Sequence, residues 1–139
     1  MAKPHILIDG RELVGRPTGV GRYLLRLLEE WAKTPEADTL TLLMPGEVPA
    51  EVARLAPAVR IEPRPARALG TLYEQTVLPR EARQLGADVF FAPAYTAPLR
   101  LPCPFVLAVY DLSYFAHPEW FSWREGWRRR WITARAARA

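Results

Sequence analysis

The segment His5-Ile6-Leu7-Ile8-Asp9 is followed, five residues later, by Gly15-Arg16-Pro17-Thr18-Gly19-Val20-Gly21-Arg22-Tyr23 and a leucine-rich stretch. The first run is short and apolar, which is typical of a buried strand, and the leucines recur at helical spacing. Glycine lets the backbone approach an anion closely, and the unpaired N–H groups of a first helical turn point toward it. The stretch therefore predicts a strand, a turn and a helix N-terminus that together can bind a nucleotide or sugar phosphate.

Short apolar segments and helical segments alternate along the rest of the chain. Helices are expected near residues 20–32, 49–55, 69–85 and 118–137, and further strands near 40–44, 59–61, 88–92 and 104–110. Pro63-Arg64-Pro65 is expected to form a stiff loop. This alternation predicts an α/β fold, a Rossmann-like parallel sheet with helices on both faces. Ligands of such sheets bind beyond the carboxyl ends of the strands, which selects one rim made of residues 9–22, 93–98 and 110–117.

Composition narrows the class of protein. A chain of 139 residues with half of them hydrophobic is about one globular domain. The single Cys103 excludes an internal disulfide and any multi-cysteine metal site, and it is expected to be inert. Fourteen prolines and few amides fit a thermophile-like composition or a high-GC genome. With neither a long apolar run nor a signal peptide in the sequence, a cytoplasmic protein is expected.

Several motifs occur in a fixed order over most of the chain. They are Thr18-Gly19-Val20-Gly21-Arg22-Tyr23, Tyr73-Glu74-Gln75 with Leu78-Pro79, Asp88-Val89-Phe90-Phe91-Ala92-Pro93-Ala94-Tyr95, Asp111-Leu112-Ser113-Tyr114-Phe115 and His117-Pro118-Glu119-Trp120-Phe121. Each motif alone is weak, but the ordered set resembles the N-terminal domain of glycosyltransferase family 4, whose members have the two-domain GT-B architecture.

The resemblance implies that a sugar is transferred, with retention of its anomeric configuration, from a nucleotide-diphosphate donor to a hydroxyl of a glycan or lipid-linked acceptor. It implies no metal and no further cofactor. Residues 1–139 would be the acceptor-side half of the GT-B fold, with the nucleotide-sugar-binding C-terminal domain outside this sequence. The chain by itself is then expected to be inactive. The alternative is a stand-alone carbohydrate- or phosphate-binding module without catalysis.

The donor diphosphate needs N–H dipoles and cations. Gly19 and Gly21 would allow the close backbone approach, and Arg22 or Arg16 would add a charge-assisted contact. The alternative is a purely structural turn, in which both glycines only permit tight packing of the helix against the strand.

Two residues follow the fifth expected strand. Many relatives carry histidine where Tyr110 stands, and Tyr110 can donate a hydrogen bond to a sugar but is no proton shuttle near neutral pH. Asp111 is the candidate catalytic residue, with capping of the next turn as the alternative. Asp9 is a candidate substrate-binding residue with the same ambiguity.

Tyr95 and Thr96 are candidates for the acceptor pocket, since aromatic faces and hydroxyls suit a sugar ring. The prolines around them make a rigid, structural loop equally reasonable. Whether Glu74 faces the cleft stays open. His117 is expected to make only local hydrogen bonds, and Trp120 and Phe121 are expected in the core.

The expected last helix carries tryptophans near one face and arginines beside them: Trp120, Trp123, Trp127, Trp131, Arg124, Arg128 and Arg135. The tryptophans could pack on the sheet while the arginines are solvated. Alternatively, the helix lies on an anionic membrane surface, which would place the protein at the inner face of the membrane. Nucleic acid is not an expected partner, because neither a helix-turn-helix nor an aromatic, basic strand platform is evident.

Overall fold

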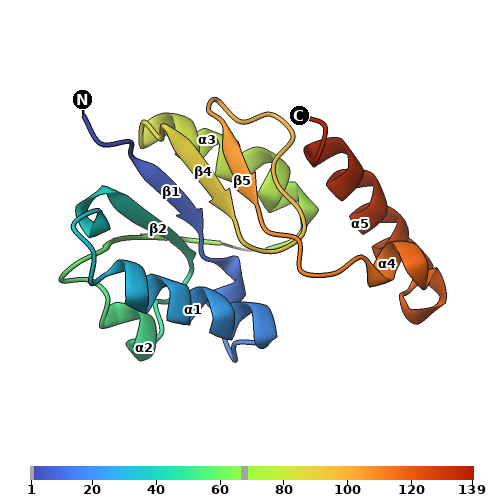
Figure 1. Cartoon of the computed structure of the whole chain (residues 1–139), viewed down its shortest axis with the longest axis horizontal. Coiled ribbons are helices and arrows are strands. Elements are labelled where there is room, and N and C mark those ends of the chain that lie inside the picture. Colours follow the sequence, from blue (N-terminus) through green and yellow to red (C-terminus); the bar gives the residue numbers. More distant parts are fainter. Residues whose placement is uncertain (1, 67–68) are drawn as a thin grey trace.

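The computed structural model of the chain describes residues 2–66 and 69–139 (Figure 1). The strands are β1 (Ile6–Asp9), β2 (Leu40–Pro45), β3 (Arg60–Arg64), β4 (Val89–Ala92) and β5 (Phe105–Leu107). They form one sheet in the order β3-β2-β1-β4-β5, and every neighbouring pair is parallel. The predicted Rossmann-like α/β fold is therefore confirmed. The strand order reverses between β1 and β4, which makes their carboxyl ends the switch point of the sheet.

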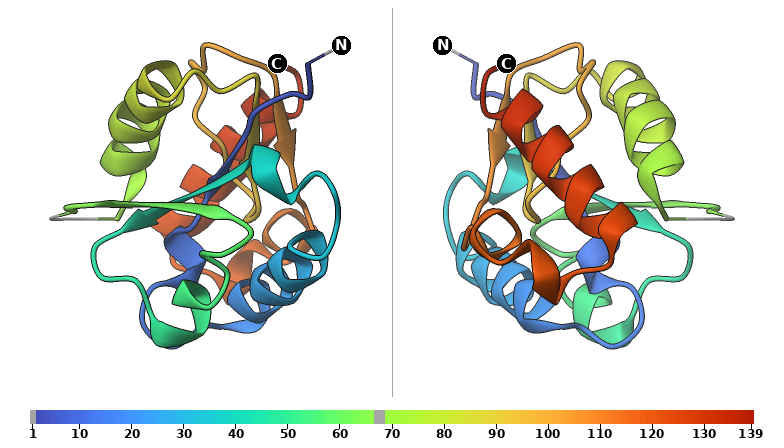
Figure 2. Two further views of the ribbon diagram at one scale, coloured as in Figure 1. Left: turned by 90° about the vertical axis from the view of Figure 1, so that its left-hand side faces the viewer. Right: turned by 90° about the vertical axis from the view of Figure 1, so that its right-hand side faces the viewer.

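Helices cover both faces of this sheet, as Figure 2 shows. Successive strand residues point to opposite faces, so the strands feed two separate cores. Ile8 lies in the core under α1 (Gly19–Trp31) and α2 (Ala50–Ala53), whereas Leu7 lies in the core under α3 (Leu78–Gln84). Because the two sides alternate residue by residue, the near-continuous apolar strands are explained by burial on both faces.

Helix α1 forms as its leucine spacing predicts. Leu24, Leu25 and Leu28 are buried against the sheet, while Arg22 and Tyr23 are exposed on the other side. Thr18 precedes the helix in an extended conformation, with φ −75° and ψ −170°. The turn before Gly19 therefore places the N-terminus of α1 at the carboxyl edge of the sheet.

Two local predictions are wrong. Pro63 and Arg64 belong to β3 and pair with β2 rather than forming a loop. Proline is tolerated there because β3 is an edge strand, so one side of it needs no ladder hydrogen bonds. Strand β5 is also shorter than expected, and the sequence did not predict the short helix α4 (Ser113–Ala116) within the rim segment 110–117.

The last helix starts later than its sequence predicts. Residues Pro118–Trp120 make only a 3₁₀ turn (η4), and α5 (Trp123–Ala136) begins after Ser122. The Ser122 hydroxyl accepts a hydrogen bond from the Glu125 N–H at 3.4 Å, a weak N-cap that competes with the proline as a start signal. The expectation of Trp120 and Phe121 in the core is wrong, because Trp120 is 66% exposed and Phe121 is only half-buried.

The tryptophans of α5 do not pack on the sheet. Trp123, Trp127 and Trp131 are 79%, 55% and 45% exposed, and the helix instead buries Ile132 and Ala136. That prediction failed because helical periodicity identifies a face but not which face is covered. Over the described ranges, the structure contains no helix with the length and apolar character that crossing a membrane requires.

Candidate functional site

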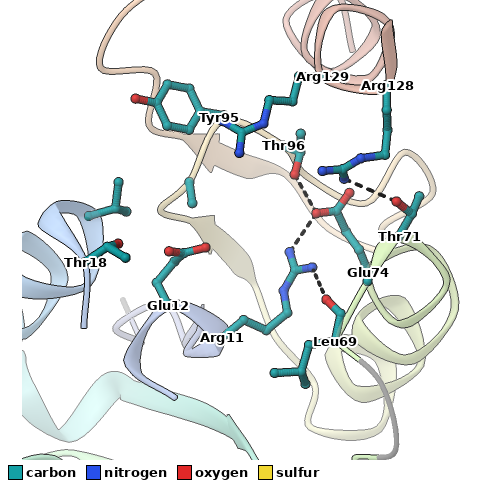
Figure 3. A pocket seen from close by; sticks show the side chains of 13 residues that line it. Arg11, Glu12, Thr18, Leu69, Thr71, Glu74, Tyr95, Thr96, Arg128 and Arg129 are labelled. Atoms are coloured by element: carbon teal, nitrogen blue, oxygen red, sulfur yellow. Dashed lines mark hydrogen bonds and ion pairs between the residues drawn. The ribbon is translucent and has the colours of Figure 1, made fainter. Parts of the chain in front are cut away.

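A cavity of about 690 Å³ opens at the switch point of the sheet, beyond the carboxyl ends of β1 and β4 (Figure 3). This volume is within the ~300–1,000 Å³ range of small-ligand sites. The lining residues come from the loops after β1 and β4, from the start of α1, from η3 (Tyr73–Val77) and the turn before it, and from α5. They are Arg11, Glu12, Thr18, Val20, Leu69, Gly70, Thr71, Glu74, Ala94, Tyr95, Thr96, Arg128 and Arg129. The edge predicted from the fold is thus where the cavity lies.

Tyr95 forms part of the cavity wall in a strained conformation. Its φ of 63° lies in the left-handed region, which costs a residue other than glycine about 1–3 kcal/mol. Three contacts hold it: its N–H donates to Ala108 O at 3.0 Å, its hydroxyl donates to Asp111 Oδ2 at 3.0 Å, and its carbonyl accepts from Thr133 Oγ1 at 2.8 Å. Burial, assisted by the Asp111 hydrogen bond, raises the pKa of Tyr95 to about 12. Tyr95 is therefore a neutral hydrogen-bonding group at physiological pH.

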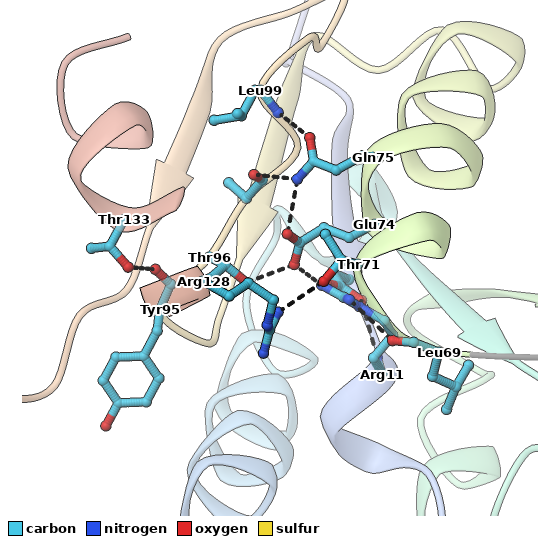
Figure 4. A network of polar contacts seen from close by, with 12 residues as sticks. Arg11, Leu69, Thr71, Glu74, Gln75, Tyr95, Thr96, Leu99, Arg128 and Thr133 are labelled. Atoms are coloured by element: carbon cyan, nitrogen blue, oxygen red, sulfur yellow. Dashed lines mark hydrogen bonds and ion pairs between the residues drawn. The ribbon is translucent and has the colours of Figure 1, made fainter. Parts of the chain in front are cut away.

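A buried polar network forms the floor of the cavity (Figure 4). Arg11 NH2 donates to Asp9 Oδ2 at 2.8 Å and to Glu74 Oε2 at 2.6 Å, and the Thr96 hydroxyl donates to the same Glu74 oxygen at 2.6 Å. Asp9 is 3% and Glu74 1% exposed. Burial alone lowers the pKa of Arg11, but the two carboxylates outweigh it and raise that pKa further above its ordinary value. Both carboxylates thus hold the guanidinium in place.

Glu74 faces the cleft, which settles the question left open by its sequence. It lies on the single π-helical turn η3, a local widening that is frequent at functional sites. The next residue, Gln75, fastens this turn to the β4 loop: its side-chain oxygen accepts from the Leu99 N–H at 2.9 Å, and its amide donates to Ala97 O at 3.2 Å. The two cavity walls are therefore joined by side-chain hydrogen bonds.

Two arginines of α5 form the opposite wall. Arg129 pairs with Glu125 at 2.6 Å and lies 5.7 Å from the centre of the Tyr95 ring. Arg128 NH1 donates to Thr71 Oγ1 at 3.2 Å. Both side chains are half-buried, so the expectation of a solvated arginine face on this helix is wrong for Arg128. They bring positive charge to the cavity.

The start of α1 provides the third wall through Thr18 and Val20. Gly19 lies between them in sequence but is exposed and does not line the cavity, and a Cβ there would meet nothing within 4 Å. At Gly21 a Cβ would collide with the Glu12 carbonyl and lie 2.9 Å from the Pro17 Cβ, so Gly21 serves packing. The structural alternative thus accounts for one glycine of the pair. Arg16 and Arg22 are exposed and do not line the cavity.

Tyr110 and Asp111 support the cavity from outside its lining. The Tyr110 hydroxyl donates to Pro93 O at 2.7 Å, and its ring meets those of Tyr23 and Tyr95 edge-on at 5.4 and 5.5 Å. Asp111 is exposed, and its Oδ1 accepts from the Ser113 hydroxyl and N–H at 2.5 and 2.9 Å. The hydrogen bonds from Ser113, and then the one from the Tyr95 hydroxyl, lower the pKa of Asp111. Asp111 caps the following turn and orients Tyr95.

Of the residues predicted for the site, Tyr95 and Thr96 line the cavity, while Asp9, Tyr110 and Asp111 hold lining residues in place. Five further lining residues were not predicted from the sequence as site residues: Arg11, Glu12, Thr71, Arg128 and Arg129. Arg11 and Glu12 follow β1 directly and fall inside the rim that the fold rule selected, so that rule could have found them. No local pattern tells which arginines of α5 face the cavity.

Within residues 2–66 and 69–139, no group of three histidine, cysteine, aspartate or glutamate side chains could hold a metal ion. The chain was compared with protein-family models, curated proteins and solved structures, and none of them matches it.

Proposed function

We propose that this chain is the acceptor-side half of a retaining glycosyltransferase, which transfers a sugar from a nucleotide-diphosphate donor to an acceptor hydroxyl. A second, nucleotide-binding domain would complete the reaction site. The donor phosphates would lie toward Gly19, and the acceptor would lie against Tyr95 and Thr18.

The observation that carries this proposal is the convergence of the family-like motifs on one cavity. Thr18, Glu74 and Tyr95 each come from a different motif and line the same space. Asp111, from a fourth motif, is hydrogen-bonded to Tyr95 at 3.0 Å. Parallel topology alone brings Thr18 and Tyr95 to this edge of the sheet, so the added support comes from Glu74, which lies on η3 and lines the same cavity.

The lining fits the needs of sugar transfer. The bond from the donor's anomeric carbon to the diphosphate breaks, the acceptor oxygen bonds to that carbon, and the hydroxyl proton leaves with the diphosphate or solvent. The departing diphosphate gains negative charge, which fixed N–H dipoles and cations stabilise. Gly19 offers the open start of a 13-residue helix, and Arg129 offers a cation already held by Glu125. The Tyr95 ring offers a surface for a sugar.

The second candidate is a carbohydrate- or phosphate-binding module without catalysis. The observation that favours it is that polar groups of the cavity are already joined within this chain, by the Arg11–Glu74 ion pair and the Thr96–Glu74 hydrogen bond. Such a module would bind its ligand with full affinity in the absence of any further domain.

The test combines calorimetry on this chain with activity of the full-length gene product. Nucleotide sugars with uridine, guanosine and adenosine bases would be incubated with the full-length protein and a set of glycans. We expect transfer or slow donor hydrolysis with one nucleotide series. Arg129→Gln should lower kcat/KM at least about tenfold, since it removes a cation from the cavity wall beside Tyr95.

The matched control is Arg26→Gln, because Arg26 is an exposed, ion-paired arginine on α1 outside the cavity. It should leave the rate unchanged. If the full-length protein neither transfers nor hydrolyses any donor while this chain binds a glycan tightly, the transferase proposal is wrong and the binding module is favoured.

A further inference from the structure

Arg128 differs from the other two arginines of the cavity. Arg11 is neutralised by Asp9 and Glu74, and Arg129 by Glu125. Arg128 forms no ion pair with any side chain in the part of the chain that the structure describes, and its one hydrogen bond, at 3.2 Å, is to the neutral hydroxyl of Thr71. A half-buried guanidinium in a cavity wall is thus left with most of its donors free.

A guanidinium in this situation matches one kind of ligand group. Its planar array of N–H donors fits the two oxygens of a carboxylate or phosphate, and such charge-assisted pairs are the strong hydrogen bonds of proteins. A neutral sugar hydroxyl would use one donor and leave the charge unpaired. Arg128 and Thr71 lie side by side in the wall, so both can donate to one oxyanion.

The opposite wall fixes how such a ligand lies. Glu12 lines the cavity beside Thr18, across from Arg128 (Figure 3). Burial and then the negative Asp9 raise the pKa of Glu12, while Arg11 and Arg129 act against them. In its ionised form this carboxylate repels a second anion placed beside it. It can accept a hydrogen bond from a sugar hydroxyl. The cavity therefore has one end suited to an oxyanion and another suited to hydroxyl groups.

We propose that the acceptor is an acidic sugar, one that carries a phosphate monoester or a carboxylate, and that Arg128 and Thr71 bind its oxyanion while its hydroxyls face Glu12 and Thr18. This inference rests on the proposed function and specifies its substrate class. Arg128 is then the residue that determines acceptor specificity.

Calorimetry on this chain tests the inference with glucose, glucose 6-phosphate, glucuronate and inorganic phosphate as probes. We expect the two acidic sugars to bind at least about tenfold more tightly than glucose, which is the effect of one charge-assisted hydrogen bond. Their affinity should fall as sodium chloride is added, whereas that of glucose should not.

Substitutions on α5 test whether Arg128 is the cause of the preference for acidic sugars. Arg128→Gln should abolish the preference for acidic sugars over glucose. The control is Arg124→Gln, because Arg124 is an exposed arginine one turn earlier on α5 that does not line the cavity, and it should keep the full preference. If Arg128→Gln unfolds the chain, Arg128→Lys and Thr71→Val replace it. Each should weaken the acidic sugars several-fold relative to glucose.

Four results would overturn the inference: equal or undetectable binding of acidic and neutral sugars, a preference that survives Arg128→Gln, inorganic phosphate binding as tightly as glucose 6-phosphate, or displacement of glucose 6-phosphate by uridine diphosphate. The last would assign the oxyanion site to the donor. The two proposals fail separately, because transfer to a neutral acceptor by the full-length protein would leave the transferase proposal intact and refute only the acidic acceptor.

Discussion

At the scale of single residues, the Tyr73 hydroxyl is a buried polar group with an unsatisfied hydrogen-bonding capacity. It has no hydrogen-bond partner among the described residues, and burial raises the pKa of Tyr73 to about 12. An unpaired buried hydroxyl costs about 1–3 kcal/mol. We therefore expect Tyr73→Phe to leave the free energy of unfolding unchanged or to increase it by up to about 1 kcal/mol, as measured by urea denaturation.

Tyr110→Phe is the matched control for that substitution. Its hydroxyl donates to Pro93 O at 2.7 Å, so its removal should destabilise the chain by about 1 kcal/mol. If Tyr73→Phe destabilises the chain more than Tyr110→Phe does, then the Tyr73 hydroxyl has a stabilising role that its surroundings do not account for.

Asp111 provides a pH-dependent prediction at the same scale. Hydrogen bonds from Ser113, and then from Tyr95, lower its pKa in the folded state. A depressed pKa contributes stability above the ordinary carboxyl pKa, and the contribution is lost as pH falls through the folded value. Ser113→Ala should therefore raise the pKa of Asp111 in an NMR titration and flatten the acid end of the stability curve. An unchanged or lower pKa would contradict this account.

At the scale of elements, the two glycines of the turn before α1 have separable roles. A Cβ at Gly21 would overlap the Glu12 carbonyl, so Gly21→Ala should destabilise the chain by about 1–3 kcal/mol. Gly19 has open space around it, so Gly19→Ala should be neutral or stabilising by up to about 1 kcal/mol. Thermal unfolding of the two variants tests this, and equal losses would mean that the packing difference has no energetic effect.

Elements were predictable where a local pattern and the tertiary environment agree. The leucines of α1 indicate both a helix and its buried face, and the continuous apolar run of β1 indicates a strand buried on both faces. Pro63 of β3 was misread because proline is tolerated only in an edge strand, and the edge position of β3 depends on the strand order. The start of α5 was misread because Pro118 and Ser122 are both good start signals, and only the 3₁₀ turn at Pro118–Trp120 decides between them.

At the scale of the whole molecule, the place of the site was predictable but its lining was not. Parallel topology alone puts the ends of β1 and β4 side by side, which brings Thr18 and Tyr95 to one cavity. Part of the charge comes from Glu74 and Arg128, on elements distant in sequence whose orientation depends on packing. Those residues could not be assigned without knowing how η3 and α5 lie against the sheet.

The exposed indoles of α5 lead to the last prediction, which concerns the whole chain on a surface. Trp127 and Trp131 stack at 6.3 Å between ring centres, and Arg135 lies 5.4 Å from the centre of the Trp131 ring. Indole rings favour the membrane–water interface, and neighbouring arginines are attracted to anionic lipids. We expect the chain to sediment with vesicles of phosphatidylglycerol and phosphatidylcholine, and far less with phosphatidylcholine alone.

Single substitutions separate the two contributions to that binding. Arg135→Gln should weaken binding to anionic vesicles about fivefold, the effect of about 1 kcal/mol per arginine near the surface. Arg26→Gln, on the exposed side of α1, should not. Trp127→Ser should weaken binding at every salt concentration, because it removes apolar contact rather than charge. If both vesicle types fail to bind and the chain instead dimerises through α5 in analytical ultracentrifugation, the indoles cover a second copy of the chain and the membrane hypothesis is wrong.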